Sequence, residues 1–224
     1  MAVRWWWRLV RFGFRLLYNE MAFTYDTVSR LVSLGQWRGW QRSALQMLPP
    51  QARDGVVLEL AHGTGDLQLD LKSAGYRTIG FDLSAQMGRI ARRKLIQHGW
   101  EPRLVRGMAQ SLPFADAQFP AIVCTFPSPF IFEQATLDEL ARVLHPAGRL
   151  VIVLSGVFTG RGPVRGVLEL LYRITGQRGD TVHDVGARLR QLFVSSPFTI
   201  QVVHIPCHKS EAVLILAEKG AGKL

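Results

Sequence analysis

Two groups of residues in this chain could bind a nucleoside. The segment 57–66 is an apolar run that contains Glu59 and ends in small residues, among them Gly63 and Gly65. This pattern is typical of a strand that turns into a helix, where glycine lets the backbone approach a ligand closely. Asp82 ends a second apolar run, 17 residues after Gly65. Its carboxylate could accept hydrogen bonds from both hydroxyl groups of an unphosphorylated ribose.

The loop after the first run favours one kind of nucleoside cofactor. A dinucleotide site usually has the pattern G-x-G-x-x-G, whereas Ala61, Gly63 and Asp66 occupy those positions here. An acid at the place of the pyrophosphate opposes an anion. S-adenosylmethionine has no phosphate, and an acidic rim favours its sulfonium and ammonium groups. We therefore expect S-adenosylmethionine as the cofactor, with a tight strand–helix turn in some other doubly wound domain as the alternative.

At these residues the chain resembles the class I S-adenosylmethionine-dependent methyltransferases. Their first motif is D/E-x-G-x-G-x-G, which Glu59, Gly63 and Gly65 match, while Ala61 replaces the first glycine. Three later segments resemble further family motifs, in the family's order. The segment 107–114 resembles the adenine loop, 119–126 the fourth strand, and 139–152 the helix, turn and fifth strand. Four ordered motifs over about a hundred residues are a specific signal.

Two positions in the later segments depart from the family. Met108 replaces an aspartate that accepts a hydrogen bond from adenine, so adenine would be held by apolar contact and backbone groups. Pro120 also replaces an aspartate, and proline is tolerated at the first residue of a strand. The resemblance implies the following cofactor-binding residues: Tyr25, Glu59, Ala61, His62, Gly63, Thr64, Gly65, Asp82, Leu83, Met87, Met108, Ala109 and Thr125.

A finer resemblance lies in the segment 25–40. It is similar to the N-terminal signature of the ubiquinone and menaquinone biosynthesis C-methyltransferases, Y-D-x-x-N-x-x-x-S-x-G-x-x-R-x-W, with Ser29 in place of the asparagine. In that family this helix covers the cofactor, which implies a contact from Tyr25. The family's motif after the fourth strand is not found at 125–130, and phospholipid-type methyltransferases share much of the same core. We expect a lipophilic small-molecule acceptor, either a quinone precursor or a lipid.

The order of apolar runs predicts an α/β fold with a doubly wound, seven-stranded, mostly parallel sheet. Alternating strand and helix patterns place parallel strands near 56–60, 77–81, 102–106, 120–125 and 149–154. Two further apolar runs, 199–205 and 212–217, are separated by a short polar turn and predict a C-terminal antiparallel pair. A chain of 224 residues fits one Rossmann-like methyltransferase domain, 43–224, with a substrate-side insertion near 157–197 and a helical N-terminal segment, 1–42, that covers the site.

The N-terminal segment is basic and aromatic. It holds seven arginines, two acids and five of the six tryptophans, in a chain of net charge +10. Arginines interrupt its apolar runs, so we expect neither a membrane span nor a signal peptide. Its first arginines lie on one helical stripe, with aromatic side chains largely on other faces, which predicts a helix in a membrane interface. We expect a cytoplasmic protein, peripheral on the inner face of an anionic membrane, with contacts through Arg4, Trp5, Trp6, Trp7, Arg8, Arg11 and Arg15.

Several alternatives stay open. The N-terminal helix could instead dock on its own domain. Its positive charge could also bind nucleic acid, which would make the chain an RNA methyltransferase. A catalytically inactive cofactor-binding partner protein is a further alternative. No spacing fixes a catalytic base, and His183 is the candidate because a hydroquinone acceptor must lose a proton. Two cysteines and scattered histidines predict no disulfide framework and no metal site; the oligomeric state is left open.

Overall fold

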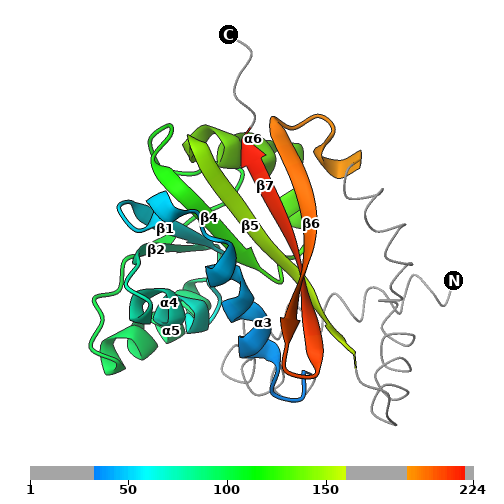
Figure 1. Ribbon diagram of the computed structural model, residues 1–224. Coiled ribbons are helices and arrows are strands. Elements are labelled where there is room, and N and C mark those ends of the chain that lie inside the picture. Colours follow the sequence, from blue (N-terminus) through cyan, green and yellow to red (C-terminus); the bar gives the residue numbers. More distant parts are fainter. Residues whose placement is uncertain (1–32, 160–190, 220–224) are drawn as a thin grey trace, which may run out of the picture.

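One sheet is the framework of the protein (Figure 1). The computed structural model describes residues 33–159 and 191–219, and within them seven strands pair in the order β3-β2-β1-β4-β5-β7-β6. The first five strands are parallel, and β7 is antiparallel to both β5 and β6. The predicted fold class is therefore confirmed. The strands are β1 (Val56–Leu60), β2 (Arg77–Asp82), β3 (Leu104–Arg106), β4 (Phe119–Thr125), β5 (Leu144–Phe158), β6 (Phe198–Cys207) and β7 (Ser210–Lys219).

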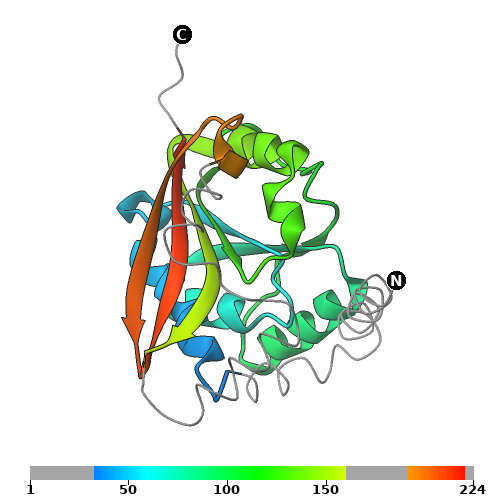
Figure 2. The ribbon, with the colours of Figure 1, turned by 90° about the vertical axis from the view of Figure 1, so that its right-hand side faces the viewer.

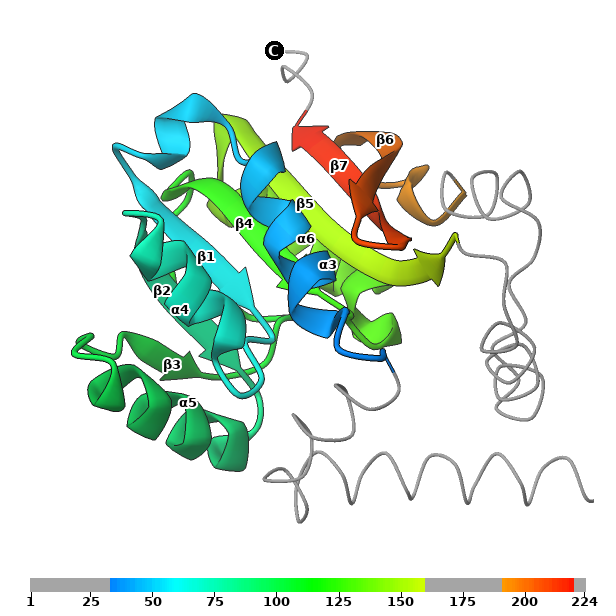
Figure 3. The ribbon, with the colours of Figure 1, turned by 60° about the horizontal axis from the view of Figure 1, so that its bottom comes forward.

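Helices cover both faces of the sheet (Figure 3). On one face lie α3 (Trp37–Ser43), α4 (Asp66–Ser73) and α5 (Ala85–Gln97), and on the other lies α6 (Gln134–Val143). In β4, Ala121 and Val123 join the core beneath α4, whereas Ile122 and Cys124 join the core beneath α6. Successive side chains of a strand point to opposite faces, so a strand buried on both faces needs a continuous apolar run. Short 3-10 turns are η2 (Ala44–Met47), η3 (Pro50–Ala52) and η4 (Pro129–Phe132).

Pro120 lies in an irregularity of β4. Phe119 pairs with Leu144 and Ala121 pairs with Arg149, so the register shifts between these two residues. Proline cannot donate a hydrogen bond to the ladder, and sheets accept it at edges, at strand starts and at bulges. The sequence predicts Pro120 at the first position of the strand, but it is the second residue, and the register shift accommodates it.

The C-terminal hairpin closes one side of the sheet (Figure 2). A two-residue turn, His208 and Lys209, joins β6 to β7, and Lys209 has a left-handed φ of 55°. β7 pairs with β5 along one side and with β6 along the other, so β6 is the edge strand. Both strands extend beyond the predicted 199–205 and 212–217.

Helix α3 is fixed to the sheet and to α4. Trp40 is buried, and its indole Nε1 donates a hydrogen bond of 2.9 Å to Ser210 Oγ at the start of β7. Arg38 and Arg42 both pair with Oδ1 of Asp70 in α4, at 2.6 and 2.9 Å. In the described part of the chain, no helix is long and apolar enough to cross a membrane. Residues 1–32 and 160–190 lie outside that part. They contain all of the predicted membrane contacts, from Arg4 to Arg15, and most of the predicted substrate-side insertion.

Candidate cofactor site

The carboxyl ends of β1, β2, β3 and β4 form one edge of the sheet. The chain proceeds from β1 through β2 to β3 on one side, and β4 lies on the other side of β1. In doubly wound sheets, ligands bind outside the carboxyl ends of strands at such a switch point. The site is therefore expected between the loops that follow β1 and β4.

The loop after β1 has an unusual backbone. Ala61, Gly63 and Gly65 have positive φ angles of 55°, 53° and 83°. At Gly65 a Cβ would lie 2.8 Å from the Cβ of Ala91 in α5, so this position accepts only glycine. Ala61 occupies the left-handed region at a cost of about 1 kcal/mol, because its Cβ crowds the following carbonyl. Ala61, in place of the first glycine of the motif, therefore adds backbone strain as well as a methyl group.

Asp82 connects two loops of the site. Its Oδ2 accepts a hydrogen bond of 2.9 Å from the Gly63 amide, and its Oδ1 accepts one of 2.8 Å from the Ser84 amide. The Ser84 hydroxyl also accepts from the Met87 amide and so caps α5. A carboxylate has about four acceptor positions. Asp82 can therefore hold the loops after β1 and β2 together and still accept hydrogen bonds from ribose hydroxyls.

Buried titratable groups lie beneath this edge. Glu59 is 1% exposed, and burial raises the pKa of its carboxyl to about 8, a shift that the Gln68 amide opposes in part. Its Oε2 has no hydrogen-bond partner among the described residues. Burial also lowers the pKa of the neighbouring His62 and raises that of the Cys124 thiol. A cation placed near Glu59 would favour the ionised carboxylate, so the site suits a positively charged ligand such as S-adenosylmethionine.

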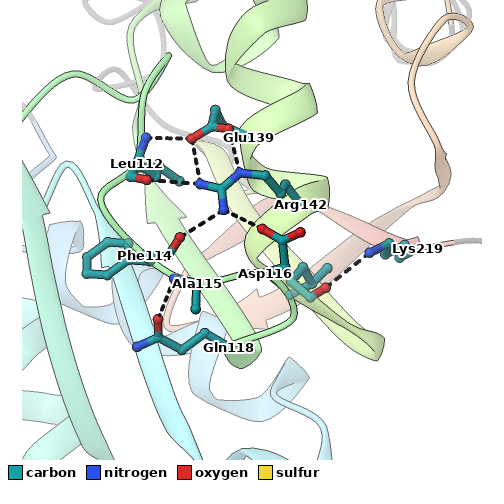
Figure 4. A network of polar contacts seen from close by, with 9 residues as sticks. Leu112, Phe114, Ala115, Asp116, Gln118, Glu139, Arg142 and Lys219 are labelled. Carbon is teal, nitrogen blue, oxygen red and sulfur yellow. Dashed lines mark hydrogen bonds and ion pairs between the residues drawn. The ribbon is translucent and has the colours of Figure 1, made fainter.

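Arg142 of α6 fixes the loop 107–118 (Figure 4). Its guanidinium donates hydrogen bonds to the carbonyls of Leu112, at 2.9 Å, and Phe114, at 2.8 Å. It also pairs with Glu139 at 2.7 Å, and the Glu139 carboxylate accepts a hydrogen bond of 2.6 Å from the Leu112 amide. The hydrogen bonds from Arg142 lower the pKa of Glu139, which keeps this carboxyl ionised. Helix α6 therefore determines the shape of the loop expected to hold adenine.

The end of β4 carries a second strained residue. Phe126 has a φ of 50°, and its ring stacks on Trp37 of α3 with 3.9 Å between centroids. The preceding Thr125 accepts a hydrogen bond of 3.3 Å at Oγ1 from Nε2 of Gln41, also in α3. Strained backbone of this kind is concentrated at functional sites. Gln41 could not be predicted from the sequence, because a single amide in a short helix forms no motif.

Most of the predicted cofactor residues lie at this edge of the sheet. Those from Glu59 to Gly65 end β1 and form its loop, Asp82 ends β2 and Leu83 follows it, Met108 and Ala109 follow β3, and Thr125 ends β4. Leu83 and Met108 are exposed apolar side chains, at 62% and 58%, whereas Met87 is fully buried. Tyr25 and His183 lie outside the described residues. Glu139 and Arg142 belong to the segment 139–152, which the sequence marks as a family motif without indicating a role for either residue.

Comparisons with known proteins agree with this arrangement. A family model described as a methyltransferase domain matches residues 57–148. The chain is 38% identical over 165 residues to the demethylmenaquinone methyltransferase of Thermus thermophilus, and this alignment covers 72% of each chain. It is 35% identical over 142 residues to a ubiquinone/menaquinone biosynthesis C-methyltransferase of Syntrophotalea carbinolica, with 62% of this chain and 60% of that protein covered.

The fold is also found in solved structures. A protein of Methanococcus maripaludis, assigned as an S-adenosyl-L-methionine-dependent methyltransferase, superposes with a TM-score of 0.61 over 92% of this chain and 93% of its own. The two sequences are 15% identical, so the similarity concerns the fold.

Proposed function

Because this chain belongs to the S-adenosylmethionine-dependent methyltransferases, we propose that it methylates a prenylated quinone precursor at a membrane surface. The observation that carries the proposal is the 38% identity to a demethylmenaquinone methyltransferase. The chain spans 60% to 72% of the lengths of the first three relatives of this kind, so the activity of the whole relative is transferred here as a proposal.

The residues of the site fit the chemistry of methyl transfer. When bound, the cofactor supplies an electrophilic methyl group, and transfer depends mainly on alignment and exclusion of water. The buried Glu59 carboxyl would gain its negative charge when a cationic ligand binds nearby and favours the ionised form, and Asp82 provides acceptors for ribose hydroxyls. A hydroquinone becomes a good nucleophile when it loses a proton, and His183 is still the predicted base.

The aromatic side chains at the end of β4 support a flat acceptor. Trp37 and Phe126 are stacked and half-buried, next to the switch point of the sheet. Aromatic rings favour offset stacking with other rings, and such pairs contribute about 0.5–1.5 kcal/mol beyond the area that they bury. A quinone ring is therefore better suited to this position than a phospholipid headgroup.

The direct test is a methylation assay with three acceptors. The full chain is incubated with radiolabelled-methyl S-adenosylmethionine and, separately, a reduced demethylmenaquinone, phosphatidylethanolamine vesicles or total RNA. We expect label in the organic phase with the quinol alone, and mass spectrometry should place one methyl group on its ring.

Each other outcome contradicts the quinone proposal. Label on phosphatidylethanolamine would make the chain a phospholipid methyltransferase, and nuclease-sensitive label would make it an RNA methyltransferase. Binding of S-adenosylhomocysteine without transfer to any acceptor would favour a catalytically inactive cofactor-binding protein.

A further inference from the structure

Gln41 has a buried acceptor atom that the fold does not use. The side chain lies on α3 and is 9% exposed. Its Nε2 donates to Thr125 Oγ1 at 3.3 Å, which fixes the amide at the carboxyl end of β4. Its Oε1 is buried and has no hydrogen-bond partner among the described residues. A buried acceptor without a partner destabilises the fold, so a ligand that donates a hydrogen bond to it would remove this penalty.

The position of Gln41 relative to the strands indicates which part of the cofactor it could reach. Asp82 ends β2, the loop 107–118 follows β3, and Thr125 ends β4 beyond β1. Neighbouring strands are about 4.8 Å apart, so β2 and β4 are separated by about 10 Å. If ribose binds at Asp82 and adenine lies toward β3, the opposite end of the cofactor extends toward β4. That end is an amino acid, with an ammonium and a carboxylate group.

We propose that Gln41 binds the amino-acid end of the cofactor, with Oε1 accepting a hydrogen bond from the α-ammonium group. The ammonium is the only charged N–H donor of S-adenosylmethionine, and a hydrogen bond from a charged donor is about twice as strong as one from a neutral donor. The bond to Thr125 holds the amide in place before the ligand arrives. Gln41 is thus a binding residue of the cofactor, whichever acceptor is methylated.

Two ligands that differ only at this end provide the test. S-adenosylhomocysteine has the amino acid, whereas 5′-methylthioadenosine keeps the adenosine and sulfur without it. Calorimetric titration of the full chain would compare the wild type with Gln41→Met, which keeps the volume and removes the acceptor. We expect S-adenosylhomocysteine to bind about tenfold more weakly to the variant, equivalent to about 1.4 kcal/mol, and 5′-methylthioadenosine to bind equally to both proteins.

A matched control is Gln51→Met. Gln51 also uses Nε2 in a hydrogen bond, to the Ala147 carbonyl at 3.1 Å, but it lies before β1, at the opposite edge of the sheet. This variant should bind both ligands as the wild type does. Gln41→Glu, which keeps an acceptor, should bind S-adenosylhomocysteine at least as tightly as Gln41→Met does.

Three results would overturn the proposal. An equal loss of affinity for both ligands in Gln41→Met, including a complete loss, would indicate that Gln41 only supports the fold. Unchanged binding of S-adenosylhomocysteine by Gln41→Met would show that Gln41 does not contact the α-ammonium group. A change restricted to the Michaelis constant of the methyl acceptor would assign Gln41 to the acceptor, and it would leave the quinone proposal intact.

Discussion

Glu59 makes the stability of the protein depend on pH. Burial raises the pKa of its carboxyl from an ordinary value of 4.5 to about 8, so the folded chain binds one proton more than the unfolded chain between these values. The stability from this group is complete below about pH 4.5 and is lost as the pH rises through 8. A shift of this size corresponds to about 5 kcal/mol at most.

Replacing Glu59 by glutamine should remove this pH dependence. We expect Glu59→Gln to be more stable than the wild type at pH 9 and close to it at pH 5, because the amide cannot ionise. Urea unfolding at the two pH values measures the difference. Glu101→Gln is the control, since the Glu101 side chain is 80% exposed. Equal shifts of the midpoint at both pH values would contradict the assignment.

Asp82 should matter for every ligand that contains ribose. Asp82→Ala removes the acceptors for the Gly63 and Ser84 amides as well as those for the hydroxyl groups. We expect both S-adenosylhomocysteine and 5′-methylthioadenosine to bind at least tenfold more weakly, unlike the ligand-selective effect expected at Gln41. Asp138→Ala, an exposed position on α6, serves as the control. Normal binding of either ligand by Asp82→Ala would exclude the ribose assignment.

At the scale of elements, α6 should act on cofactor binding through the loop 107–118. Arg142→Met removes charge-assisted hydrogen bonds to the carbonyls of Leu112 and Phe114. Each such bond contributes about 1.5–3 kcal/mol when it is shielded, and less here because Arg142 is about a third exposed. We expect reduced stability and weaker binding of both adenosine ligands.

The chain offers a matched control for Arg142. Arg149 has a similar exposure, pairs with Glu218 at 2.6 Å and donates to the Met47 carbonyl at 3.0 Å. Because Arg149 lies toward the amino end of β5, Arg149→Met should lower the unfolding temperature without changing ligand affinity. Equal affinity losses in the two variants would show that affinity follows overall stability rather than the loop.

The elements differ in how far the sequence could predict them. Strands such as β4 have both faces buried, so a continuous apolar run marks them, and the predicted 120–125 agrees with Phe119–Thr125. β5 was expected at 149–154 but extends over Leu144–Phe158. Its first residues include His145, Pro146 and Gly148, and their extended form depends on tertiary context rather than on side-chain pattern.

The site shows the same division. Gly63 and Gly65 could be predicted because their positive φ angles favour glycine. Asp82 could be predicted because it follows an apolar run and so marks the end of a strand. Gln41 donates a hydrogen bond to Thr125 of β4, which is 84 residues away in the chain, and no local sequence pattern predicts that contact. The hydrogen bonds from Arg142 also join segments distant in the chain, so only the fold reveals its contacts with the loop 107–118.

At the scale of the whole molecule, a net charge of +10 should attract the protein to anionic membranes. Deleting residues 1–19 removes four arginines and three tryptophans. We expect the full chain, but not the shortened one, to float with vesicles that contain phosphatidylglycerol, and neither to float with phosphatidylcholine alone. Equal flotation of both forms would contradict the membrane proposal. Binding of S-adenosylhomocysteine should survive the deletion, because the described site residues lie beyond it.

The position of β7 between β5 and β6 imposes an order on biosynthesis. The parallel strands can pair as they emerge from the ribosome, but β6 has no neighbour until residues 210–219 are synthesised. During this interval β5 has an open edge, and open edges of incomplete sheets pair readily with other chains. The nascent protein is therefore most exposed to aggregation and to chaperones just before its sheet is closed, and a chain stalled ahead of Ser210 should be cleaved by protease within β6.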